Sequence, residues 1–335
     1  MGGTVQSSLV QRLCQATMVS TLSLTVAASA FAADGNWPRC RSADPEERIA
    51  GCTEIITKIA KETKHNRIAA YLNRGGAYHI KGDYGRAIAD FDKAHEIDQK
   101  SALILTNRAA SYRAKGDLDH AISDYDAAVT AEPKYAPAYF GRGSVYHAKT
   151  NLEHAIADYS EAINRDKLYA AAFDARAAAY RAMGASDDKV LSDLSEAVKI
   201  DRKSAVVHLH RGAFYQSKGD YDHAIEDFSE AIRRDRKSAV ALNDRGLAYH
   251  GKGDFDHAIR DFDQAIGLDA DYAHAYLNRA NAYRGKHDFD QAKKDIEFAL
   301  KLNPQLTAAK KGRDDVEKLI ASRSVTPPAA PPPPH

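Results

Sequence analysis

Histidine is the residue type in this sequence that could most readily bind a metal ion, and the chain has fourteen of them. Several of these histidines occupy the same position of a segment that recurs along the chain. They therefore lie on separate secondary-structure elements and do not converge on one ion. Neighbours two apart on a helix, as His208 and His210 are, point to different faces. The sequence therefore predicts solvated histidines, no metal site and no cofactor. The recurring copies, each directly after an acidic residue, are His120, His154, His223 and His257.

Catalytic chemistry has no visible basis in the sequence. The carboxylates recur by position, as helix caps and first-turn charges, and do not form one convergent pair. Each Gly-Asp pair belongs to a turn and not to a phosphate-binding loop, and no nucleophile motif is present. With 47 basic and 46 acidic residues and no basic run, the chain is poorly suited to nonspecific binding of nucleic acid. We expect neither an enzyme nor a nucleic-acid-binding protein.

Arginine and aspartate form two columns that match one another. The arginines are Arg74, Arg108, Arg142, Arg176, Arg211, Arg245 and Arg279. The aspartates are Asp90, Asp124, Asp158, Asp193, Asp227, Asp261 and Asp295. A ligand would rarely need one contact in all seven places, so we expect an ion-pair ladder between two helices. Breaking a buried pair from one side would cost roughly 3–5 kcal/mol.

The columns belong to a segment of 34 residues, such as Ala239–Tyr272, that recurs along most of the chain. Apolar residues at helical spacing lie on both sides of a Gly-Asp break, which predicts helix, turn and helix. Gly253 is expected to end the first helix and Asp254 to cap the second. One step is 35 residues long, and the extra residue falls between Tyr180 and Asp193, in a predicted surface turn.

Four registered columns of small and bulky residues resemble the tetratricopeptide repeat family. The small residues of the first helix are Gly75, Ala109, Gly143, Ala177, Gly212, Gly246 and Ala280, each followed three residues later by Tyr. The bulky residues of the second helix are Phe91, Tyr125, Tyr159, Leu194, Phe228, Phe262 and Ile296. The resemblance implies an all-α fold, an α-solenoid in which helix-turn-helix repeats form a right-handed superhelix. The family's helix-ending proline survives only as Pro133 and Pro304, and its early Trp is absent.

In the resembled family the first helices line a concave groove that binds extended peptides or helices of partner proteins. That geometry implies a lining of His, Arg and amide side chains beside a column of small residues, which would leave room for a protein or peptide ligand, including an acidic one. The groove residues that we predict to bind the partner are Asn73, Asn107, Arg113, His147, Arg181, His250, Asn278, Asn281 and Arg284. Its histidines would strengthen anion binding below about pH 6.5. Small residues replace most of the side chains with which some members clamp a carboxylate tail, so that function is not expected.

Residues 1–32 resemble an export signal, with Arg12, an apolar run and a small-x-small site ending at Ala32. An uncleaved anchor is the alternative, although the run is short and polar for a membrane span. Cleavage would leave Cys40 and Cys52 as the remaining cysteines, and an exported chain favours a disulfide between them. Two unpaired thiols are the alternative. The expected location is periplasmic or secreted, without stable membrane insertion after cleavage.

The remaining boundaries follow from the repeat register. Residues 33–67 read as a capping half repeat with the disulfide, residues 68–303 as seven repeats and residues 304–321 as a C-terminal capping helix. Residues 322–335 hold six of the eleven prolines and read as an extended, solvated tail, which is a spacer or a ligand for a proline-binding domain.

These observations lead to one functional hypothesis and two alternatives. We expect a non-enzymatic scaffold that binds a partner polypeptide in its concave groove, with a rigid superhelix presenting spaced polar groups. One alternative is a self-assembling structural module whose ends or convex surfaces form oligomers. The other is an accessory binder of anionic glycans.

Overall fold

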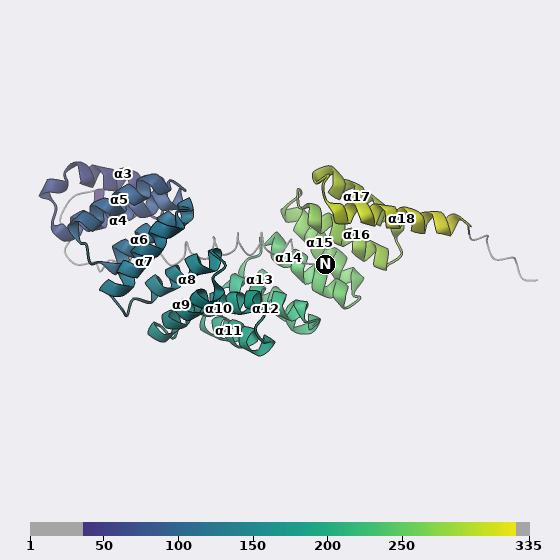
Figure 1. Cartoon of the computed structure of the whole chain (residues 1–335). Coiled ribbons are helices and arrows are strands. Elements are labelled where there is room, and N and C mark those ends of the chain that lie inside the picture. The colour runs from purple at the N-terminus through teal and green to yellow at the C-terminus, as the bar shows by residue number, and fades with distance from the viewer. Residues whose placement is uncertain (1–35, 326–335) are drawn as a thin grey trace, which may run out of the picture. The chain divides into compact units, whose positions relative to one another are not determined.

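The computed structural model describes residues 36–325, which form seventeen α-helices and no strand. The chain divides into two compact units that meet between Ile200 and Asp201, and each is described by itself. Figure 1 shows helical hairpins stacked side by side within each unit. The all-α repeat fold expected from the sequence is confirmed. The predicted signal at residues 1–32 and the proline-rich part of the tail lie outside the described residues, so export and location stay predictions.

The first unit holds the N-terminal cap and four hairpins, each made of a helix A and a helix B. The cap consists of α2 (Asn36–Cys40), α3 (Pro45–Thr57) and a 3-10 turn at Ile59–Lys61. The hairpins are α4 (Lys64–Ile80) with α5 (Tyr84–Ile97), α6 (Ala102–Lys115) with α7 (Leu118–Ala131), α8 (Ala136–Ala148) with α9 (Leu152–Arg165), and α10 (Ala170–Met183) with α11 (Asp187–Ile200).

The second unit holds three hairpins and a terminal helix. The hairpins are α12 (Ala205–Ser217) with α13 (Tyr221–Arg234), α14 (Ala239–Gly251) with α15 (Phe255–Leu268), and α16 (Ala273–Gly285) with α17 (Phe289–Leu302). Helix α18 (Thr307–Val325) follows and buries Ala309 and Val316 against the last hairpin. It continues four residues past position 321, where the sequence places the end of the capping helix. No helix in residues 36–325 combines the length and the apolar character needed to span a bilayer.

Local sequence explains where the helices begin and end. Asp117 and Asp254 cap α7 and α15, and each accepts a hydrogen bond from the backbone N–H three residues later. The turn before α7 needs a left-handed residue, which Gly116 supplies at φ 89°. The same role falls to Thr150 at φ 58° before α9 and to His287 at φ 61° before α17. The turns are therefore set by backbone geometry more strictly than by residue type.

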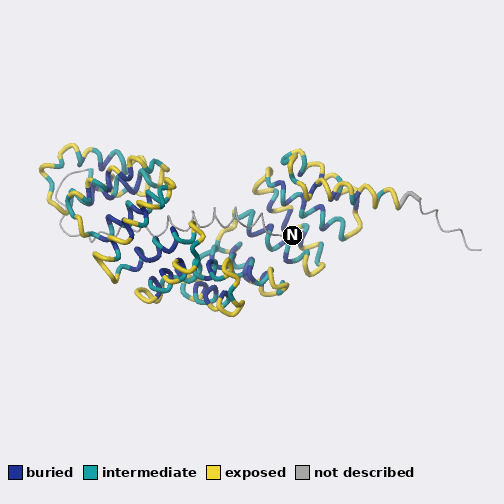
Figure 2. Tube along the Cα trace, in the orientation of Figure 1, coloured by how far each residue is buried: buried dark blue, intermediate teal, exposed yellow. Residues whose placement is uncertain are grey.

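Small residues allow helices A and B to approach closely. A Cβ atom built on Gly246 would lie 2.7 Å from the ring of Phe262, which is fully buried on α15. Gly75 stands in the same relation to Phe91, also at 2.7 Å. Figure 2 shows the result as buried backbone where helices face one another and exposed backbone at the turns. The small and bulky columns identified in the sequence are thus the core of each hairpin.

The N-terminal cap contains the expected disulfide, which joins Cys40 of α2 to Cys52 of α3 with Cα atoms 4.5 Å apart. Trp37 and Ile55 are buried beside it against α4. Helix α3 packs on α4, and its Thr53 accepts a hydrogen bond from Arg74. The cap therefore occupies the place that a preceding helix B takes in the other repeats.

Loss of the disulfide is expected to loosen the cap. A double variant, Cys40→Ser/Cys52→Ser, should lose about 3 kcal/mol of stability, because the bond no longer restricts the unfolded segment. Hydrogen exchange of α2 and α3 is the measurement, with α16 as the internal reference. Parent protein treated with a reductant should match the variant. Equal exchange in variant and oxidised parent would contradict the prediction.

Candidate functional site

The predicted ion-pair ladder is present in all seven repeats. Each arginine donates from Nε and Nη2 to both oxygens of the aspartate on its own helix B, at 2.6–2.9 Å. The partners are sixteen residues apart, except for Arg176 and Asp193, which are seventeen apart. This difference places the extra residue in the turn before α11, as the sequence predicts. The aspartates are buried, with 3–7% of their surface exposed.

The same arginines also join neighbouring repeats. In six repeats Nη1 donates to an oxygen on the preceding helix: Thr53, Asp92, Asp126, Ser160, Ser229 and Asp263. The hydrogen bonds that these arginines donate to the aspartates raise the pKa of the arginines, so they stay charged at any physiological pH. The ladder is therefore a structural feature that ties three helices together at each step, and it leaves little capacity for a ligand.

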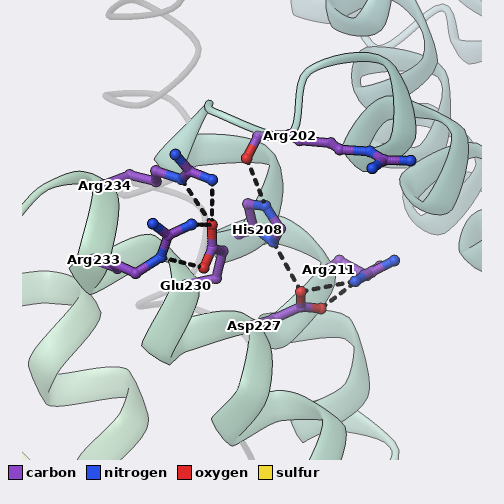
Figure 3. A network of polar contacts seen from close by, with 7 residues as sticks. All are labelled: Arg202, His208, Arg211, Asp227, Glu230, Arg233 and Arg234. Atoms are coloured by element: carbon purple, nitrogen blue, oxygen red, sulfur yellow. Dashed lines mark hydrogen bonds and ion pairs between the residues drawn. The ribbon is translucent and has the colours of Figure 1, made fainter.

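In the fifth repeat the ladder has a third member (Figure 3). His208 is buried, and its Nδ1 lies 3.0 Å from Asp227, which Arg211 also contacts. Burial alone would raise the pKa of Asp227, but hydrogen bonds from His208 and Arg211 outweigh it and lower the pKa. The His208 Nε2 atom lies 3.4 Å from the backbone oxygen of Arg202. A neutral imidazole has one N–H and serves one of these acceptors at a time.

The recurring histidines reinforce the helix starts. In three of the four, Nδ1 lies 2.7–2.8 Å from the capping aspartate, and in His154 it lies 2.8 Å from Asn151. Each ring also packs against the tyrosine of its own helix A, with centroids 4.9–5.1 Å apart. The sequence analysis missed this capping role. Within residues 36–325 no group of His, Cys, Asp and Glu could hold a metal ion.

The predicted binding residues lie on helices A. Within each unit a helix A touches the next helix A, as α4 touches α6 and α14 touches α16, whereas no two helices B in residues 36–325 make contact of similar extent. Helices A therefore lie on the inner side of each stack, and we call their shared surface the helix-A face. The unit boundary divides the nine predicted residues. Asn73, Asn107, Arg113, His147 and Arg181 lie in the first unit, and His250, Asn278, Asn281 and Arg284 lie in the second.

The histidines of the helix-A face are less basic than the sequence suggests. His79 is half-buried and lies 2.8 Å from the hydroxyl of Ser111. Burial lowers the pKa of His79, and the charge of Arg113 lowers it further. Burial also lowers the pKa of His147, and the pKa of His250 falls for the same reason. The expected gain of positive charge below about pH 6.5 therefore moves to more acidic conditions.

Asn107 is the most deeply placed of the predicted residues in the first unit. Only 6% of its surface is exposed, and its amide nitrogen has no hydrogen-bond partner among residues 36–325. The corresponding residue of the next repeat is Gly141, and the ring of Tyr125 occupies the place of a Gly141 side chain, 2.2 Å from an ideal Cβ. The buried amide nitrogen of Asn107, a donor without an acceptor, lowers the stability of the fold by about 1–3 kcal/mol.

In the second unit the amides are linked to one another. Asn278 on α16 donates from Nδ2 to Oδ1 of Asn243 on α14 at 2.8 Å. Asn243 in turn donates to Oδ1 of Asp244 at 3.2 Å. Sequence analysis missed Asn243 as a site residue. The available signal was its register, since Leu209 and Leu277 take its position in the neighbouring repeats.

The other predicted residues have diverse surroundings. Arg181 is exposed at the end of α10, whereas Arg284 lies close enough to His250 for its charge to lower the pKa of that ring. A hydrogen bond from the His250 ring to the backbone of Asn281 favours the protonated ring and opposes this shift. Asn73 lies with Nδ2 3.9 Å from Sγ of Cys40. The predicted residues therefore supply several small polar clusters and not one uniform basic row.

Hairpins joined by a ladder, with polar clusters on helices A, define an all-helical repeat scaffold. Profiles described as tetratricopeptide repeat match residues 68–101, 136–167, 215–276 and 273–306, and one described as TPR repeat matches residues 109–150. Together these stretches cover more than half of the chain, so the chain belongs to the tetratricopeptide repeat family. Arrays of this kind serve as protein–protein interaction modules. A search of curated proteins finds no match.

Solved structures with similar folds have low sequence identity. The APC/C hetero-tetramer Cut9-Hcn1 matches with a TM-score of 0.60 and 16% identity, over 81% of this chain and 52% of that chain, so this chain spans about half of its length. The C-terminal part of a TPR repeat-containing protein from Cytophaga hutchinsonii matches with a TM-score of 0.56 and 17% sequence identity. The match covers 72% of this chain and 98% of that chain. A tetratricopeptide repeat protein from Parabacteroides merdae matches with a TM-score of 0.52 and 18% sequence identity, over 75% of this chain and 99% of that chain. These likenesses support the fold alone.

Proposed function

We propose that the chain is a non-enzymatic scaffold that binds a partner polypeptide on its helix-A faces. The observation that carries this proposal is the pair of arginines at equivalent positions of helices A in the first unit, Arg113 and Arg181, of which Arg181 is exposed. Guanidinium groups on such a surface can bind polar or acidic groups of an extended partner segment. Family membership supports the same reading, because solenoids of this type use such surfaces for binding.

Charge on the first unit favours acidic groups in the partner. Arg113 lies near His79 and Tyr125. Burial lowers the pKa of His79 and the charge of Arg113 lowers it further, whereas burial raises the pKa of Tyr125 and the charge of Arg113 opposes that rise. Arg181 lies at the equivalent place two repeats later and is exposed. Guanidinium groups bind carboxylates through charge-assisted hydrogen bonds. The binding side chains are carried on packed helices, so the partner need not order them on binding.

The test is selection from a random dodecapeptide library displayed on phage. Parent protein should enrich related sequences, and Arg113→Glu/Arg181→Glu should lose most of that enrichment through charge repulsion. The matched control is Lys100→Glu/Lys134→Glu, which makes the same charge change at exposed positions in the turns between hairpins.

Circular dichroism must first confirm that each variant keeps its helical content. Failure of the parent to enrich any peptide would refute the proposal. Equal enrichment by the parent and by Arg113→Glu/Arg181→Glu would refute the role of these two arginines. Concentration-dependent size in ultracentrifugation without peptide binding would favour self-assembly, and saturation by a sulfated polysaccharide alone would favour the glycan alternative.

A further inference from the structure

One carboxylate on the helix-A face of the second unit differs from the aspartates of the ladder. Asp244 follows Asn243 on α14 and is half-buried, yet no Lys, Arg or His within residues 36–325 forms an ion pair with it. The Oδ1 atom of Asp244 accepts a hydrogen bond of 3.2 Å from Asn243. By contrast, Asp261 on the facing helix α15 is held by both nitrogens of Arg245. The fold supplies a cation to the ladder carboxylates and none to Asp244.

The surroundings of Asp244 are neutral and come from three helices A. Asn278 of α16 holds Asn243 in place at 2.8 Å, so the amide that contacts Asp244 is itself oriented. Gln216 of α12 reaches the backbone oxygen of Asp244 with Nε2 at 3.5 Å. Burial raises the pKa of the phenol of Tyr272, which precedes α16, and the negative charge of Asp244 raises it further. These side chains build a polar site around one carboxylate without neutralising it.

An ionised carboxylate in such surroundings is costly until a cation reaches it. Burial raises the pKa of Asp244 to about 6, although the hydrogen bond from Asn243 opposes the shift. Around neutral pH much of the group is still charged, and the residue as a whole is half-buried on α14. Attraction between opposite charges is stronger here than at a fully solvated surface. The missing component is therefore a positive charge from another molecule.

We propose that Asp244, held by Asn243 and Asn278, binds a lysine or arginine side chain of the partner polypeptide. The inference rests on the proposed function and adds a second selectivity to it, since Arg113 and Arg181 of the first unit favour acidic groups. Charge complementarity selects this occupant, because an acidic or apolar side chain would leave the carboxylate unpaired. The partner should carry a basic residue for the second unit.

The library described above tests this inference separately. Peptides selected by the parent should carry a basic residue at one fixed position, and Asp244→Asn should remove that preference. The matched control is Asp290→Asn, the same substitution at an exposed position of α17, which should keep it. Circular dichroism and thermal melting should show that Asp244→Asn folds as well as the parent, since the amide is nearly isosteric.

A double-mutant cycle then measures the contact. A labelled selected peptide should lose about tenfold or more in affinity when its basic residue is changed to Gln, and likewise with Asp244→Asn. The two changes combined should weaken binding no more than either alone. A parent that enriches no peptide refutes the proposed function and this inference with it. Enriched peptides without a basic preference, or a preference that persists in Asp244→Asn, refute the inference alone.

Discussion

Arg245→Ala is expected to destabilise the second unit by roughly 3–5 kcal/mol, because it leaves the buried carboxylate of Asp261 without its cation. Asp261 is 3% exposed and receives two hydrogen bonds from Arg245, at 2.7 and 2.8 Å. The same substitution removes the bond from Arg245 to Ser229 on α13, so the contact between neighbouring repeats weakens as well. Urea unfolding followed by circular dichroism is the measurement.

The reverse truncation should be milder. Asp261→Ala leaves a guanidinium that is 21% exposed and can turn toward water, whereas the carboxylate left by Arg245→Ala cannot. Arg245→Met/Asp261→Leu should recover much of the loss, since it removes both charges and keeps volume. The control is Arg260→Ala, because Arg260 is exposed and precedes Asp261 in the sequence. This substitution should change the free energy of unfolding by no more than about 0.5 kcal/mol. If Arg245→Ala is as stable as Arg260→Ala, the ladder contributes nothing to the stability of the second unit.

Gly141→Ala is expected to destabilise the first unit by about 1–3 kcal/mol through overpacking. The added methyl would lie 2.2 Å from Cε1 and 2.3 Å from Cζ of Tyr125, whose side chain is 1% exposed and cannot withdraw into solvent. The clash must outweigh the gain of up to about 1 kcal/mol that alanine brings to a helix interior. Unfolding in urea and hydrogen exchange of α7 and α8 would report the effect.

Gly267→Ala is the matched control, because Gly267 lies inside α15 with open space around its Cα. Here the helix preference acts alone, and stability should rise by about 0.5–1 kcal/mol. The prediction is thus a difference in sign between two glycine-to-alanine changes in helices. If both variants are stabilised, Tyr125 can move aside and the close approach of its ring is not required by the fold.

The sequence by itself determined the repeat, the ladder and the disulfide. The repeat and the ladder depend on contacts with fixed spacing: a hairpin without the extra turn residue brings residues sixteen apart together, so Arg245 and Asp261 could be paired by counting. The small and bulky columns were readable for the same reason. The disulfide was expected because an exported chain with two remaining cysteines favours a bond between them. The extra residue before α11 could be located because an insertion in a turn shifts every later position equally.

Only the tertiary structure decided which polar residues on helices A remain available. Whether an amide already has a hydrogen-bond partner depends on side chains from neighbouring repeats, and the register of the repeat does not reveal this. Asn278, for example, donates a hydrogen bond to Asn243. The ring of Tyr125 from the adjacent hairpin fills the place of a side chain at Gly141, and the residue type at position 141 does not reveal this contact. Asp244 has an ordinary residue type and spacing, and its importance follows from the absence of a pairing cation in residues 36–325. Burial and charge balance arise from the packed neighbours and not from a position in the repeat.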